Sequence, residues 1–171
     1  VVQALVDLPR PERETAVRTM IAQLTKHFEG DVVDGLVSRA EAALASVDDD
    51  EEIEALLSFL HVSKASDDFG FDLVGYLPGT VGSPPEVLFL EAKSSPGRSF
   101  IVSAHEWEVA ERDELRALYA FLVVHRGEGG QPKAMEILRD PPSLLAEGRI
   151  SRTVKDWGVD YVLDFTDGAR T

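Results

Sequence analysis

The segment VLFLEAK at residues 87–93 decides the fold and points to a chemistry. Its first four residues are all apolar, which is typical of a central strand that is buried on both faces. Successive side chains of a strand point to opposite faces, so Glu91 and Lys93 should share one face and Ala92 should occupy the other. The sequence therefore predicts a buried strand that ends in a carboxylate and an ammonium, roughly 7 Å apart along the strand.

Helices are expected before this segment, and strands on both sides of it. Apolar residues at helical spacing predict amphipathic helices over about 11–28 and 31–47, and a third over about 53–60. Ser103 and Glu106 have the spacing of a capping box, which predicts a helix that begins after Ser103. Further strands are expected at residues 71–76, 99–102, 118–125, 133–138 and 160–165. We therefore expect an α/β fold, with a mixed sheet core flanked by helices over residues 63–171 and a helical N-terminal extension over residues 1–62.

Composition excludes several classes of site and partner. The chain has 171 residues, no cysteine and a formal net charge of -14. Without cysteine it forms neither disulfides nor thiolate zinc sites. No run approaches the roughly 18 apolar residues of a membrane-spanning helix, and no signal peptide is evident, so we expect a soluble cytoplasmic protein with no membrane partner. An acidic surface repels polyanions, so this chain alone should not hold nucleic acid by surface charge. The first residue is valine, which favours a module of a longer protein.

Two acidic residues on neighbouring strands suggest a metal site. Asp72 falls on the strand expected at residues 71–76 and Glu91 on the next strand, and carboxylates held by strands can converge on one divalent cation. Mg²⁺ (or Mn²⁺) binds hard oxygen ligands and keeps several waters, so these two carboxylates and the Ala92 carbonyl would suffice as protein ligands. Lys93 would orient the attacking water or stabilise charge on a phosphate. This set of residues predicts metal-assisted hydrolysis of a phosphodiester.

The order of these residues resembles a known nuclease family. Asp72, followed by Glu91-Ala92-Lys93 and then by a strand and a helix, is similar to the PD-(D/E)xK core of the restriction-endonuclease-like fold. More narrowly, residues 67–145 resemble the protein NO VEIN C-terminal domain family. The stretches that carry this resemblance are GFDL at 70–73, LEAKS at 90–94 and SAHEW at 103–107.

The resemblance implies roles for individual residues and a class of substrate. Asp72 and Glu91 would be metal ligands, Lys93 would lie beside the attacking water, and Glu106 would face the site as an outer ligand or water-positioning group. The substrate would be nucleic acid, expected to be DNA, held mainly by other domains or subunits of a larger bacterial defence or DNA-processing protein. Members of the family often carry an acidic residue on a helix before the first strand, and Glu54 is the candidate here.

Simpler explanations compete with each functional one. A Glu-x-Lys at a strand end also arises by chance, and a nuclease fold that has lost its chemistry would act as a protein-interaction module. The acidic run at residues 48–52 is better explained by solvated acids in a first helical turn, which complement the helix dipole, than by a cation-binding cluster. His105 is either an auxiliary base or a solvated side chain. Arg112 and Arg116 either contact phosphates or pair with glutamates of the same expected helix.

Overall fold

The computed structural model describes residues 5–46, 49–79, 83–97, 99–155 and 160–166. The chain divides into two compact units, Val1–Phe89 and Leu90–Thr171, which we call unit 1 and unit 2. The division falls inside strand β2 (Glu86–Ser95), so the segment at residues 87–93 contributes to both units. The expected boundary between residues 62 and 63 lies within unit 1, and a nuclease-like domain over residues 63–171 stays a prediction.

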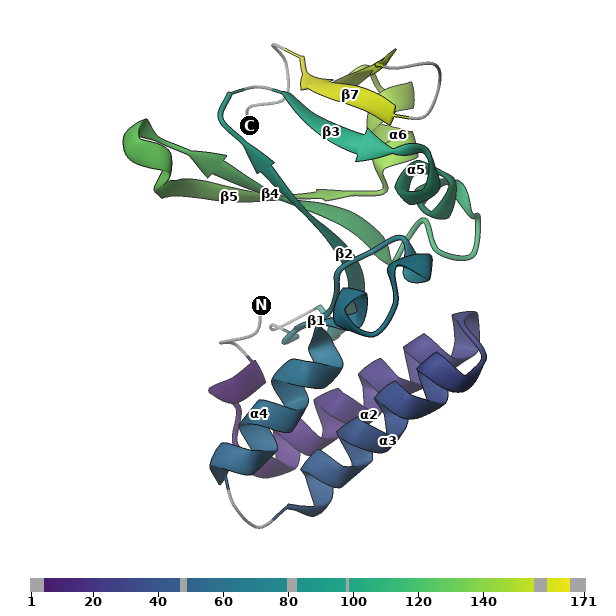
Figure 1. The fold of residues 1–171 in the computed structure, drawn as a ribbon, viewed down its shortest axis with the longest axis vertical. Helices are drawn as coiled ribbons and strands as arrows, with labels where there is room; N and C mark the ends of the chain where they lie inside the picture. The colour runs from purple at the N-terminus through teal and green to yellow at the C-terminus, as the bar shows by residue number, and fades with distance from the viewer. Residues whose placement is uncertain (1–4, 47–48, 80–82, 98, 156–159, 167–171) are drawn as a thin grey trace. The chain divides into compact units, whose positions relative to one another are not determined.

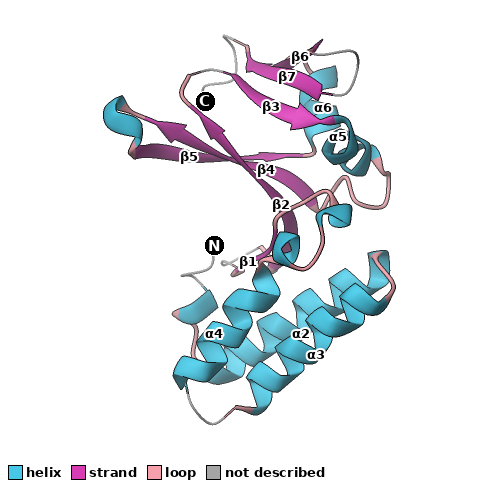
Figure 2. Cartoon of the chain, viewed as in Figure 1, coloured by secondary structure: helices cyan, strands magenta, loops and turns pink. Residues whose placement is uncertain are grey.

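Three α-helices make up most of unit 1, as the helical spacing predicted (Figures 1 and 2). They are α2 (Arg10–His27), α3 (Asp31–Ala45) and α4 (Asp49–Leu60). Pro11 lies in the first turn of α2, where its missing N–H costs no hydrogen bond. Gly30 separates α2 from α3 with a φ of 110°, a backbone conformation that other residues rarely adopt. The buried face of α2 consists of Ala16, Val17, Met20 and Leu24.

The acidic run at the start of α4 is not entirely solvated, so that expectation is wrong for Glu52. Only 1% of Glu52 is exposed, and its Oε1 accepts a hydrogen bond from Nη1 of Arg13 at 3.2 Å. Arg10 Nε lies 3.8 Å from the other carboxylate oxygen, and Arg13 also donates to the Leu8 carbonyl at 3.3 Å. Glu52 therefore joins α4 to α2 through a buried ion pair.

A cluster of aromatic rings lies in the core of unit 1, just before the first strand begins. Its members are Phe28, Phe69, Phe71 and Phe89, and the rings of Phe71 and Phe89 are stacked with centroids 4.7 Å apart. Strand β1 (Leu73–Leu77) begins two residues later than predicted, after Phe71, which belongs to this cluster. The Asp72 carbonyl accepts a hydrogen bond from Ser63 N at 3.3 Å. Asp72 consequently lies immediately before the strand and not on it.

Unit 2 contains most of the strands. After β2 come β3 (Ser99–Ser103), α5 (Ala104–Glu111), β4 (Tyr119–Arg126), β5 (Pro132–Arg139), α6 (Pro141–Ala146), β6 (Ile150–Val154) and β7 (Asp160–Phe165). The strands form two sheets, one with the order β1-β2-β4-β5 and one with the order β3-β7-β6. Strands β4 and β5 form an antiparallel hairpin in which Phe121 lies opposite Leu138 (Figure 1).

The second sheet differs from the single core sheet that the sequence predicted. Strand β3 pairs with β7 over Ser99–Ser103, and β7 also pairs with β6. Strand β6 was not expected, because four of its five residues are exposed and it lacks an apolar alternation. The protein is therefore mixed α/β, as predicted, whereas the restriction-endonuclease-like arrangement stays a prediction. Among the described residues, none of the helices combines the length and the apolar character that crossing a membrane requires.

Candidate functional site

The end of β2 places a carboxylate and an ammonium side by side. Glu91 and Lys93 lie on the same face of the strand, as their spacing predicted, and Lys93 Nζ is 2.7 Å from Glu91 Oε1. Glu91 is a buried charged residue, with 6% of its surface exposed. Ala92, on the opposite face, is exposed. The alternation of the strand thus brings two charged side chains into direct contact inside unit 2.

A second carboxylate reaches the same ammonium from the first turn of α5. Glu106 Oε2 lies 2.6 Å from Lys93 Nζ. The predicted capping box is present: Glu106 N donates to Ser103 Oγ at 3.2 Å, and Ser103 N donates to Glu106 Oε2 at 3.0 Å. We call Glu91, Lys93 and Glu106 the Lys93 cluster. It joins the end of a strand to the start of a helix through one ammonium group.

The charges of the Lys93 cluster favour the protonated lysine. Burial would lower the pKa of Lys93, but the negative charge of Glu91 and the hydrogen bonds to Glu106 and Glu91 outweigh burial and raise this pKa above its usual value. Lys93 is therefore an ammonium at neutral pH, although only 14% of its side chain is exposed. Two carboxylates face one ammonium, so these three side chains together carry one excess negative charge.

The other predicted site residues are each described within their own unit. Asp72 is partly buried in unit 1, just before β1, and its role as a ligand beside Glu91 stays a prediction. Glu54 is exposed on α4, also in unit 1. His105 is exposed on α5, next to Glu106 in the sequence, and its role as an auxiliary base stays a prediction.

The Lys93 cluster has the donor chemistry of a site for a hard cation but not a complete ligand set. Carboxylate oxygens are the ligands that Mg²⁺ takes in proteins, and Glu91 and Glu106 direct two of them toward one point. That point is occupied by Lys93 Nζ. Within the described part of the chain, no three or more histidine, aspartate or glutamate side chains are grouped so that they could hold a metal ion. A cation at Glu91 would therefore need a further ligand or a displaced lysine.

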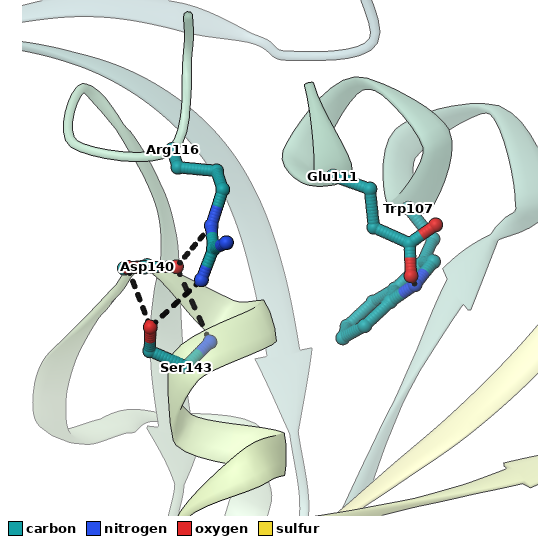
Figure 3. A network of polar contacts seen from close by, with 5 residues as sticks. All are labelled: Trp107, Glu111, Arg116, Asp140 and Ser143. Atoms are coloured by element: carbon teal, nitrogen blue, oxygen red, sulfur yellow. Dashed lines mark hydrogen bonds and ion pairs between the residues drawn. The ribbon is translucent and has the colours of Figure 1, made fainter. Parts of the chain in front are cut away.

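Arg116 belongs to a different polar network, drawn in Figure 3. Helix α5 ends at Glu111, so Arg112 and Arg116 do not lie four apart on a helix as expected. Arg116 Nε donates to Asp140 Oδ1 at 3.1 Å, and Nη2 donates to Ser143 Oγ at 2.8 Å. The expected pairing of Arg116 with a glutamate of α5 is therefore wrong, because its partner comes from the start of α6.

Asp140 terminates β5 and caps α6 in this network. Its side chain accepts hydrogen bonds from Ser143 N at 3.2 Å and from Ser143 Oγ at 2.7 Å. Its φ of 46° is left-handed, a conformation in which aspartate and asparagine are enriched among non-glycine residues. Burial would raise the pKa of Asp140, but hydrogen bonds from Ser143 and Arg116 and the charge of Arg116 lower it overall.

Arg152 on β6 forms a contact that the sequence did not reveal. Its guanidinium carbon lies 4.7 Å from the ring centroids of both Trp107 and Tyr161. Glu111 accepts a hydrogen bond from Trp107 Nε1 at 2.5 Å and lies 3.5 Å from Arg152 Nη1 (Figure 3 shows the first of these contacts). The contact joins α5 to the β3-β7-β6 sheet, and its residues lie too far apart in the sequence for spacing to indicate it.

Comparisons with protein-family models, with curated proteins and with solved structures find no match to this chain. The resemblance to the NO VEIN family therefore stays a prediction from the residues that carry it. A functional proposal for this protein depends on the chemistry of its own side chains, and the Lys93 cluster offers the most specific arrangement.

Proposed function

We propose that the Lys93 cluster is part of the catalytic centre of a Mg²⁺- or Mn²⁺-dependent nuclease, a module of a larger bacterial defence or DNA-processing protein. The observation that carries the proposal is the contact of one ammonium with two carboxylates, one from the same strand and one from the first turn of the following helix. Glu91, Lys93 and Glu106 are also residues to which the resemblance assigns roles in the site, together with Asp72.

The excess negative charge of the cluster supports the binding of a cation. Glu91 is buried, and the ammonium that it contacts is also contacted by Glu106, so these three side chains carry a formal charge of one excess negative unit. Glu91 would hold Mg²⁺ with the Ala92 carbonyl, and Asp72 as the second carboxylate ligand stays a prediction from the sequence. When bound, Mg²⁺ would lower the pKa of a coordinated water and offset charge on the phosphate.

Lys93 would be the positive group of the protein that faces the substrate. A phosphodiester is an anion, and its approach to two carboxylates is unfavourable unless positive charge is already in place. The ammonium of Lys93 is held by the carboxylates of Glu91 and Glu106. This ammonium can donate a hydrogen bond to the attacking water or to a phosphate oxygen, and it stabilises the charge that develops during attack.

The overall charge of the chain suggests how the substrate is held. DNA binding is favoured when basic side chains neutralise phosphates and release the counterions of the DNA. A chain with a net charge of -14 offers little of this attraction over its surface as a whole. We therefore propose that other domains or subunits hold the nucleic acid, expected to be DNA, and that this chain supplies the hydrolytic residues.

The test compares cleavage by wild type, Lys93→Met and Glu91→Gln with Mg²⁺ or Mn²⁺ present. Supercoiled plasmid, linear duplex and single-stranded RNA should each be offered, because the cluster does not select among them. Each variant should reduce cleavage by about 10²–10⁴-fold, the usual worth of a group that assists proton transfer or stabilises charge. Matched controls are Lys133→Met on β5 and Glu108→Gln on α5, both at exposed positions. Asp72→Asn tests the predicted ligand of unit 1 in the same assay.

Cleavage that survives both cluster variants would refute the proposal, as would cleavage that is independent of divalent cations. Folding of each variant is checked by circular dichroism, so that loss of structure is not mistaken for loss of chemistry. If wild type is folded, binds neither Mg²⁺ nor Mn²⁺ in calorimetric titration and cleaves nothing, the interaction-module alternative replaces the nuclease.

A further inference from the structure

One oxygen atom of Glu106 has two partners of different kinds. Oε2 accepts the hydrogen bond from Ser103 N at 3.0 Å that closes the capping box, and it also contacts Lys93 Nζ at 2.6 Å. Glu106 N in turn donates to Ser103 Oγ at 3.2 Å. The interactions that begin α5 therefore fix the position of the atom that holds the lysine.

Ser103 is itself held on two sides. It is the last residue of β3, where it lies opposite Asp160 of β7, and it is the N-cap of α5. The helix is anchored beyond the cap by Trp107 and Ala110, which are 1% and 0% exposed. Ser103 is therefore fixed by a strand pairing before it and by a buried helix after it, so its hydroxyl has a defined direction.

We propose that Ser103 is a positioning residue for Lys93. Its hydroxyl holds the first turn of α5, the turn holds the Glu106 carboxylate, and the carboxylate holds the ammonium. The consequence for catalysis rests on the proposed function, whereas the ordering of Lys93 does not. Serine is suited to this role because its hydroxyl accepts the N3 backbone hydrogen bond that a capping box requires.

The flexibility of lysine explains why such a device is needed. An ammonium on a four-carbon stem has many conformers, and a single contact with Glu91 fixes its distance but not its direction. A second contact from another element leaves the ammonium fewer positions, because Nζ has to stay close to both carboxylates. Loss of the cap would release Glu106 and return Lys93 to a mixture of conformers, so the turnover number should fall while substrate binding is kept.

Two substitutions separate the cap from the charge. Ser103→Ala removes the hydroxyl and leaves the Glu106 carboxylate, whereas Glu106→Gln keeps a side chain that can close a capping box and removes the charge. Ser103→Thr restores the hydroxyl. The matched control is Ser151→Ala at an exposed position of β6. All are compared in the full chain.

The first readout is the NMR signal of the Lys93 ε-methylene group, assigned through Lys93→Arg. Its two protons are inequivalent when the side chain is held in one conformer and become equivalent when it rotates freely. We expect inequivalence in wild type, Ser103→Thr and Ser151→Ala, and its loss in Ser103→Ala and Glu106→Gln. The proposal is overturned if Ser103→Ala keeps the wild-type signal, or if Ser103→Thr fails to restore it.

The second readout is kinetic and applies once cleavage is measured. Ser103→Ala should lower kcat about tenfold with KM unchanged, and Ser103→Thr should recover most of the loss. An unchanged kcat, or a loss that is confined to KM, overturns the catalytic part of the proposal. If wild type cleaves nothing while the NMR result is as expected, the proposed function fails and the positioning of Lys93 by Ser103 stands.

Discussion

Each unit of the molecule contains a cluster of three charged side chains. In one cluster the positive groups outnumber the negative ones, and in the other the negative groups outnumber the positive one. In unit 1, one carboxylate, Glu52, contacts two arginines, Arg13 at 3.2 Å and Arg10 at 3.8 Å. In unit 2, one ammonium, Lys93, contacts two carboxylates. The first cluster has an excess positive charge, which Arg10 carries at a 46% exposed position where water solvates it. The second has an excess negative charge beside the buried Glu91.

This difference separates a charge cluster that stabilises a fold from one that, under the proposed function, would also face a divalent cation. A guanidinium is planar and permanently charged, and Arg13 uses it to bond both Glu52 and the Leu8 carbonyl. Lys93 is a point charge on a flexible stem, and nothing in its contacts requires a fork of donors. The unit 1 cluster should therefore contribute most to stability, and the unit 2 cluster should respond most to added cations.

The largest expected effect is on the stability of unit 1. Arg13→Met leaves Glu52 buried without its main partner, and removal of one partner from a buried ion pair costs about 3–5 kcal/mol. We expect that loss in the free energy of unfolding measured by urea titration with far-UV circular dichroism, to which the helices α2, α3 and α4 contribute strongly. Tryptophan fluorescence reports on unit 2 through Trp107, which is buried there.

The double variant Arg13→Met with Glu52→Leu is the control for this prediction. Replacement of both partners by apolar side chains is often neutral, so most of the lost stability should return. If the single variant loses less than about 1 kcal/mol, the pair behaves like an exposed one and the comparison between the two clusters fails.

A smaller effect is expected from added Mn²⁺, and it should depend on unit 2. Binding to the native state stabilises it by about 2.7 kcal/mol when the free ion is roughly 100 times above Kd. The urea midpoint followed by tryptophan fluorescence should therefore rise with Mn²⁺ in wild type. Glu91→Gln should abolish the rise, because it removes the buried carboxylate of the cluster. An equal rise in Glu91→Gln would place the ion elsewhere.

The two clusters also differ in how well the sequence predicts them. Glu91 and Lys93 are two residues apart on a strand, and Ser103 and Glu106 three apart at a helix start, so local geometry determines each pair. Arg13 and Glu52 are 39 residues apart, and Arg116 and Asp140 are 24 apart. Local periodicity carries no information about such distant partners.

The same reasoning explains where the predicted elements failed. The sequence predicts a strand over residues 71–76 that includes Asp72, but the neighbouring Phe71 packs into an aromatic cluster that includes Phe28 and Phe89. Strand β6 was missed because only Ile150 of its five residues is buried, so the pairing with β7 and not an apolar pattern defines it. The first failure depends on contacts with residues far apart in the sequence, and the second on the backbone pairing of two consecutive strands.

Arg152 provides a third and weaker test, because its charge lies against aromatic rings and not in a buried cluster. Arg152→Ala should cost about 1 kcal/mol in the free energy of unfolding of unit 2, the usual worth of a partly exposed cation–π contact. Arg152→Lys keeps the charge and loses the planar group that stacks on Trp107 and Tyr161. If lysine restores full stability, the ion pair with Glu111 is the source of the effect and the stacking is not.

The smallest expected effect concerns Asp140, whose ion pair with Arg116 is about one-third exposed on each side. Asp140→Asn keeps an N-cap and a residue that tolerates a φ of 46°, so it removes only the charge. The lowered pKa means that the native state favours the carboxylate. The stabilisation that this carboxylate gives the folded state is therefore complete above 3.8, its ordinary pKa. It is lost as the pH falls from there through the lower pKa of the folded state. At neutral pH Asp140→Asn should be less stable than wild type by about 0.5 kcal/mol in urea titration, and the difference should close at acid pH.

Asp140→Ala, which also removes the cap, should remain less stable than wild type at every pH. A deficit of Asp140→Asn that persists unchanged in acid would mean that the amide disturbs the cap, and that the charge of Asp140 contributes nothing.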